Sequence, residues 1–77
     1  MTIQVRFFAS LRERMGRADA ELEAGAANTV GEVWAAVAGG EAMPDNLLMA
    51  INQDYVQAHA SVADGDEVAF FPPVTGG

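Results

Sequence analysis

The end of the sequence offers the clearest chemistry, because it closes on two glycines. Pro72 and Pro73 stop the preceding strand, since proline lacks the backbone donor that a sheet interior needs. The four residues that follow are Val74, Thr75, Gly76 and Gly77. Extended, they span at most roughly 13–14 Å and end with almost no side-chain bulk. Such a tail can enter a narrow channel and present its carboxylate to a catalytic site on another protein, although Gly-Gly alone is more typical of a frayed end.

Few side chains elsewhere offer comparable chemistry. The chain has no cysteine and a single histidine, His59, which excludes a disulfide framework, a thiolate zinc site and a multi-histidine metal site. The acidic run at 64–67 lacks the length and spacing of a calcium loop, so we interpret it as a turn. A lone surface histidine and an acidic turn need no function, and the terminal carboxylate remains the strongest candidate.

Length and charge narrow the class of protein further. The 77 residues predict a single domain, 1–77, with 74–77 as a flexible tail. The net charge is −7, and the four basic residues are all arginines. An acidic, lysine-free chain is a poor match to nucleic acid. The sequence shows neither a signal peptide nor an apolar run that could span a membrane, so we expect a cytoplasmic protein.

Alternation of apolar and polar residues predicts the strands that must carry this tail. They cover residues 2–9, 18–24, 47–52, 55–56 and 67–71. One face of the resulting sheet is apolar and consists of Ile3, Val5, Phe7, Met49, Ile51, Val56, Val68 and Phe70. The acidic side chains of 18–24 share one face of their strand, which is typical of a solvated edge strand.

Two further segments predict helices. A short one begins at Ser10, where Glu13 completes a capping box, and stops at Gly16. The main helix begins at Thr29, with Glu32 as its capping-box partner. Its apolar stripe follows helical spacing and consists of Val30, Val33, Trp34, Val37 and Ala38.

This order of elements predicts an α+β fold. The stripe of the main helix covers one sheet face. The first and last strands are the most apolar, so we expect them at the centre. A mixed sheet of four to five strands with one main helix packed on one face, arranged in this way, is the ubiquitin-like β-grasp.

The strand phase also predicts the composition of the opposite, outer face of the sheet. Phe8, Leu48, Tyr55 and Phe71 fall there among polar residues. A group of exposed aromatics on so small a domain indicates a partner-binding surface. The alternative is that segment 10–16 or the long loop after the main helix folds back over them.

The sequence resembles the small subunits of molybdopterin synthase, a family of β-grasp sulfur carriers. The resemblance covers the whole chain, and its most specific part is DGDEVAFFPPVTGG at 64–77. VRFFA at 5–9, LRE at 11–13, Gly16 and AINQ at 50–53 add to it. Between 17 and 46 only the general pattern matches, so nothing functional is carried onto that segment.

The resemblance implies a role for the tail. A ubiquitin-activating-type adenylyltransferase would use ATP to adenylate the carboxylate of Gly77. Sulfur would then be delivered to this group and give a Gly77 thiocarboxylate. The small subunit would then donate sulfur to cyclic pyranopterin monophosphate, forming the dithiolene of molybdopterin. Val74, Thr75 and Gly76 would thread the partner's site. The chain would thus be a non-catalytic subunit with no bound cofactor or metal.

The resemblance also implies partners. The large, catalytic subunit and the activating enzyme would contact a surface made of Phe8, Arg12, Tyr55, Phe71, Pro72 and Pro73. Tyr55 is a mild departure, since the family often has an aliphatic residue there. Two small and two large subunits would form a heterotetramer. A sulfur carrier of another pathway, such as thiazole synthesis, and a ubiquitin-like protein modifier remain the alternatives.

Overall fold

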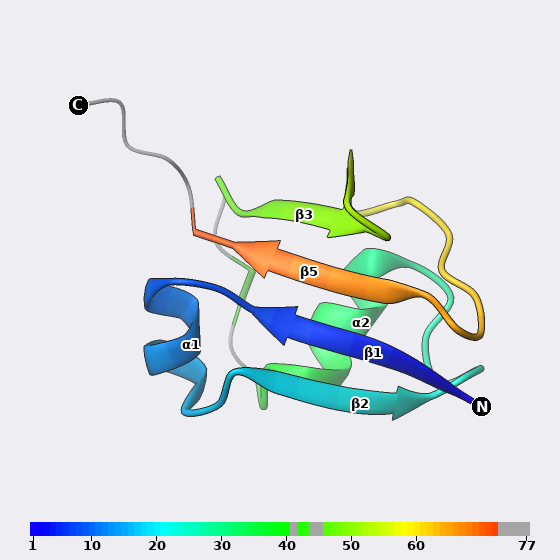
Figure 1. Ribbon diagram of the computed structural model, residues 1–77, viewed down its shortest axis with the longest axis horizontal. Coiled ribbons are helices and arrows are strands. Elements are labelled where there is room, and N and C mark those ends of the chain that lie inside the picture. The colour runs from blue at the N-terminus through cyan, green and yellow to red at the C-terminus, as the bar shows by residue number, and fades with distance from the viewer. Residues whose placement is uncertain (41, 44–45, 73–77) are drawn as a thin grey trace.

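The computed structural model describes residues 1–40, 42–43 and 46–72 (Figure 1). The elements found in these residues are β1 (Thr2–Phe7), α1 (Ser10–Met15), β2 (Asp19–Glu23), α2 (Val30–Val37), β3 (Leu48–Ile51), β4 (Asp54–Val56) and β5 (Glu67–Phe71). The described strands form one mixed sheet in the order β2-β1-β5-β3-β4. The predicted ubiquitin-like β-grasp is therefore confirmed, with β1 and β5 side by side in the interior of the sheet.

The centre of the sheet is a parallel pair of strands. β1 and β5 run in the same direction in a register that aligns Val5 with Val68 and Phe7 with Phe70. β2 and β3 flank this pair as antiparallel neighbours, and β4 completes the sheet beyond β3. Both central strands therefore end at the same edge of the sheet, beside α1 (Figure 1).

The core lies between the sheet and α2, which crosses behind it in Figure 1. Phe70 is fully buried; its ring stacks on Phe7 at 6.0 Å and meets the edge of Trp34 at 5.1 Å between centroids. Trp34 is thus a core residue, as its place on the helix stripe predicted. Within the described residues the core has no buried polar side chain, so burial of apolar surface is what holds the two layers together.

The ends of α2 agree with the sequence. The Thr29 hydroxyl accepts a hydrogen bond from the Glu32 amide at 3.2 Å, which confirms the predicted cap. The Glu32 carboxylate in turn accepts from the Asn28 amide at 2.8 Å. At the other end, the Arg17 guanidinium donates to the Val37 carbonyl at 2.8 Å and so satisfies a carbonyl of the last turn.

The predicted capping box of α1 is wrong. The helix begins at Ser10, but its N-cap is Ala9, and no side chain caps it. The Phe8 and Ala9 carbonyls accept from the Leu11 and Arg12 amides instead, so the backbone itself satisfies the first donors. This needs a sharp reversal with a positive φ of 53° at Ala9, which sequence periodicity does not indicate. Gly16 ends the helix in the left-handed region, as predicted.

The hairpin between β3 and β4 lies one residue earlier than predicted. The sequence favoured Gln53 and Asp54 as the connection, whereas Asn52 and Gln53 form it, with φ of 50° and 74°. Positive φ at both central residues matches the twist of the flanking strands, and asparagine tolerates it well. Asp54 consequently belongs to β4.

In the described part of the chain, neither helix has the length and apolar character that crossing a membrane requires.

The two phenylalanines that end β5 provide a stability test of the two sheet faces. Phe70→Ala should lower the free energy of unfolding by about 3–5 kcal/mol, because it empties a fully buried site between Phe7 and Trp34. Phe71 is half-buried on the opposite face, so Phe71→Ala should lower the free energy of unfolding by only roughly 1 kcal/mol. Urea denaturation followed by circular dichroism measures both, and equal losses would show that the faces are assigned wrongly.

Candidate functional site

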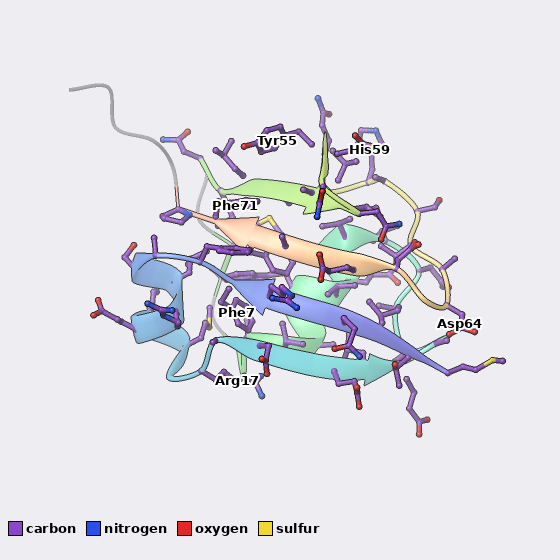
Figure 2. All side chains as sticks on the ribbon, in the orientation of Figure 1. Phe7, Arg17, Tyr55, His59, Asp64 and Phe71 are labelled. Carbon is purple, nitrogen blue, oxygen red and sulfur yellow. The ribbon has the colours of Figure 1, made fainter. Side chains whose placement is uncertain are left out.

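Three aromatic side chains gather on the sheet face opposite α2. Phe8 follows β1 directly, Phe71 ends β5, and their rings stack with centroids 4.7 Å apart and planes 11° from parallel. Tyr55 of β4 lies 6.1 Å from Phe71 at a tilt of 57°. Figure 2 shows Phe71 near the tip of β5 and Tyr55 beyond β3. We call Phe8, Tyr55 and Phe71 the aromatic patch.

The strand register explains why these rings meet. Phe7 pairs with Phe70 in the parallel ladder, and the next residue along each strand points to the other face. Phe8 and Phe71 are therefore neighbours on the outer face because their predecessors are neighbours in the core. Phe8 is 39% exposed and Tyr55 73% exposed, so α1 does not fold back over them.

Beside the aromatic patch the outer face is hollowed. The floor consists of Ala50 and Ala69, which pair across β3 and β5 and are only 3% and 8% exposed although they face away from the core. Taller side chains shield them, and the hollow measures about 380 Å³. It is lined by Arg6, Phe8, Ala50, Gln53, Tyr55, Glu67, Ala69 and Phe71. We call this space the alanine hollow.

An ion pair closes one end of the alanine hollow. The Nε of Arg6 lies 2.8 Å from a carboxylate oxygen of Glu67, with both side chains partly open to solvent. Farther along the same face, the amide of Gln4 donates to Glu21 of β2 at 2.7 Å. The outer face therefore carries its aromatic rings on β4 and where β1 and β5 end, and polar side chains along β1, β2 and the start of β5.

The patch adjoins the end of the strand that leads to the glycine tail. β5 ends at Phe71, and Pro72, which follows it, is half-buried. The predicted tail residues Val74, Thr75, Gly76 and Gly77, together with Pro73, lie outside the described residues. The aromatic patch thus stands where the chain leaves the sheet toward the predicted reactive carboxylate.

The other residues singled out in the sequence lie apart from this site or have local roles. Arg12 is exposed on α1, and its proposed contact with a partner stays a prediction. His59 is exposed in the segment between β4 and β5 (Figure 2). The carboxylate of Asp66 accepts from the Ala63 amide at 2.8 Å and the Asn52 side chain at 3.0 Å, which identifies it as a turn residue.

Sequence reasoning missed the floor of the alanine hollow. Ala50 and Ala69 occupy outer-face positions of the predicted strands, so their direction followed from the alternation. Their role as the floor of a hollow did not follow, because a hollow forms at an alanine only where larger side chains surround it, and here those side chains come from separate strands. Gln53 was missed for a different reason, since it lies in the hairpin between β3 and β4, where strand alternation does not assign a face.

Comparison with known proteins decides the family. The ThiS family matches residues 5–77, nearly the whole chain. This protein belongs to the ThiS family. Among its curated relatives is the molybdopterin synthase sulfur carrier subunit of Haemophilus influenzae, which is 40% identical over 85 residues, covering 97% of this chain and 99% of the relative.

Solved structures of similar proteins share the fold of this ThiS-family chain. SAMP1 from Haloferax volcanii superposes with a TM-score of 0.82 at 26% identity, covering 100% of both chains. Subunit 1 in a complex of subunits 1 and 2 of the molybdopterin-converting factor from Helicobacter pylori gives a TM-score of 0.65 at 25% identity, again over 100% of both chains. Each shares the β-grasp arrangement described above.

The ion pair at the alanine hollow should contribute little to folding. Arg6→Ala should change the free energy of unfolding by no more than about 1 kcal/mol, because exposed pairs gain little Coulomb energy in water. Thermal or urea unfolding checks this, with Glu67→Gln as the companion variant. A loss of several kcal/mol in either variant would show that the pair is structural rather than part of an open surface.

Proposed function

We propose that this protein is the sulfur carrier subunit of a molybdopterin synthase. The observation that carries the proposal is the place of the aromatic patch: two of its rings, Phe8 and Tyr55, are exposed, and it adjoins the end of the strand that leads into the Gly76-Gly77 terminus. The 40% identity to a named sulfur carrier subunit over nearly its full length supports it. A docking surface beside the end of the strand that precedes the Gly76-Gly77 terminus suits a chain that delivers a group to another protein's active site.

The proposed chemistry takes place at the carboxylate of Gly77. A carboxylate is a poor electrophile, so an adenylyltransferase of the ubiquitin-activating type would first join it to AMP from ATP, with pyrophosphate leaving. Hydrosulfide then attacks the acyl carbon and AMP leaves, which gives the thiocarboxylate. Each thiocarboxylate tail passes its sulfur to a carbon of cyclic pyranopterin monophosphate. Water then cleaves the acyl–sulfur bond and restores the Gly77 carboxylate, and two rounds build the dithiolene of molybdopterin.

The chain's own contribution is to bind and to position. It offers no cysteine and one histidine, so it suits a role in which the large subunit supplies the pocket and the acid–base groups. The aromatic patch would hold the partner while the tail enters its site. The complex of subunits 1 and 2 from Helicobacter pylori supports a large-subunit partner, and we propose a heterotetramer of two small and two large chains.

A ubiquitin-like protein modifier is the second candidate. The chain superposes more closely on SAMP1, with a TM-score of 0.82, than on the molybdopterin-converting factor subunit, with 0.65. A second structure of the Haloferax volcanii protein gives its name as small archaeal modifier protein 1, at 26% identity and a TM-score of 0.80. Sequence identity favours the carrier, at 40% against 26%. The two roles differ in the step that follows activation. A modifier is joined to an amine of another protein, whereas a carrier gives up its sulfur.

Intact-mass measurement tests the proposed chemistry. Incubation with the activating enzyme, ATP and a sulfur source should exchange one oxygen of the chain for sulfur. Adding the large subunit and cyclic pyranopterin monophosphate should reverse the exchange and form molybdopterin. Adducts on other proteins in place of this reversal would indicate a modifier, and an unchanged mass with a competent activating enzyme would refute the proposal.

Variants of the tail test whether it is functional rather than structural. Deletion of Gly77, or Gly76→Trp, should abolish sulfur transfer, because the first draws the terminal carboxylate back by one residue and the second adds bulk where a narrow channel is expected. Ala36→Trp, which places the same ring on the exposed side of α2, is the matched control and should transfer sulfur normally. Thermal melts should match that of the unmodified chain, and a large loss of stability in the tail variants would contradict the assignment.

A variant of the aromatic patch tests docking. Phe71→Ala should weaken binding to the large subunit by roughly tenfold or more, since buried aromatic anchors dominate protein interfaces. Isothermal titration calorimetry measures the affinity, and the unfolding experiment described for Phe71→Ala shows that the variant remains folded. Unchanged affinity would exclude the aromatic patch from the interface.

A further inference from the structure

The alanine hollow is an unfilled space on an otherwise well-packed sheet. Its floor is made of the two methyl groups of Ala50 and Ala69, and the rings of the aromatic patch stand along its side. Methyl groups and ring faces cannot hydrogen-bond, so water lying against the floor and the rings lacks partners there, whereas the polar groups that line the rest of the hollow belong to Arg6, Gln53, Tyr55 and Glu67. An inserted apolar side chain would release that water and contact the floor and the rings together.

The charged end of the hollow restricts what this side chain can be. Arg6 and Glu67 already pair with each other at 2.8 Å, so an inserted group need not bring a charge to satisfy either. A second charge placed between them would have to compete with the existing pair. A large aliphatic or aromatic side chain therefore fits the alanine hollow better than a charged one.

A row of carboxylates runs along the same face on β2. Asp19, Glu21 and Glu23 are exposed and pair in register with Arg6, Gln4 and Thr2 of β1. We call Asp19, Glu21 and Glu23 the acidic row. Since Arg6 also pairs with Ala69, the acidic row lies two strand spacings, or roughly 10 Å, from the floor of the alanine hollow.

The acidic row shows which kind of surface complements this face. A partner that covers both features meets negative charge beside an apolar hollow, and complementary charge favours association while like charge opposes it. A second copy of this chain has a net charge of −7 and repeats the acidic row, so it is a poor occupant. A protein surface with basic side chains is the complementary one.

We propose that the outer face of the sheet docks a protein surface that carries one large apolar side chain and, roughly 10 Å away, a group of basic side chains. The apolar side chain enters the alanine hollow, and the basic ones lie over the acidic row. This deepens the proposed function and rests on it, because the partner used to test it is the large subunit of molybdopterin synthase. Ala50 and Ala69 become specificity-determining positions, since any larger residue there fills the hollow.

The first arm of the test fills the alanine hollow. Ala69→Leu should lower the affinity for the large subunit about tenfold or more, because the partner's side chain no longer has a site. Ala36→Leu, the same change on the exposed side of α2, should leave the affinity unchanged. Both variants should melt like the unmodified chain, since position 36 is exposed and the hollow above Ala69 has room for the added carbons.

The second arm removes charge from the acidic row. The double variant Glu21→Gln with Glu23→Gln should associate more slowly with the large subunit and show a shallower dependence of the rate on salt. Asp54→Asn with Asp64→Asn removes two exposed charges elsewhere and is the matched control. It should keep the salt dependence close to that of the unmodified chain.

The outcomes separate the two levels of inference. If the unmodified chain binds the large subunit, and Ala69→Leu binds equally well or the two charge variants share one salt dependence, the docking geometry proposed here is overturned while the proposed function stands. If the unmodified chain does not bind the large subunit at all, both are overturned. Surface plasmon resonance at several salt concentrations measures every one of these quantities.

Discussion

The parallel pairing of β1 with β5 is the constraint on which the rest of this structure depends. It places Val5 against Val68 and Phe7 against Phe70, and these side chains form the layer that α2 covers. Because side chains alternate along a strand, the same register brings Phe8 and Phe71 together on the opposite face. A slip of one residue would expose the core and bury the aromatic patch at once. The core and the candidate interface therefore both depend on the register of one strand pair.

Much of this arrangement could be predicted from the sequence because it depends on periodicity. The bounds of β5, the cap at Thr29 and the inward set of apolar residues all follow from patterns that span several residues. The errors fall where one backbone conformation decides the outcome. The reversal at Ala9 and the left-handed pair at Asn52 and Gln53 have no periodic signature, and each moved a boundary or a cap.

The candidate site could be predicted in part for the same reason. Strand phase placed Phe8, Tyr55 and Phe71 on one face, but the alanine hollow depends on the contrast between small and tall neighbours from separate strands. Only the sheet order brings Ala50, Ala69 and the rings together. In the proposed function this chain supplies a binding surface and the large subunit supplies the active site. This fits a domain with so small a core, because such a domain can form a shaped surface more readily than an enclosed pocket.

The parallel central pair also governs how the chain reaches its folded state. β5 lies near the end of the described residues, yet it is the direct neighbour of both β1 and β3. Until β5 has been synthesised, β1 can pair only with β2, and α2 has half a sheet to cover. Contacts between such distant segments form late and together, because a long loop must close first. The last strand of the described residues is therefore the one that completes the sheet, so Phe8, Tyr55 and Phe71 come together on one face only after the other described strands have been made.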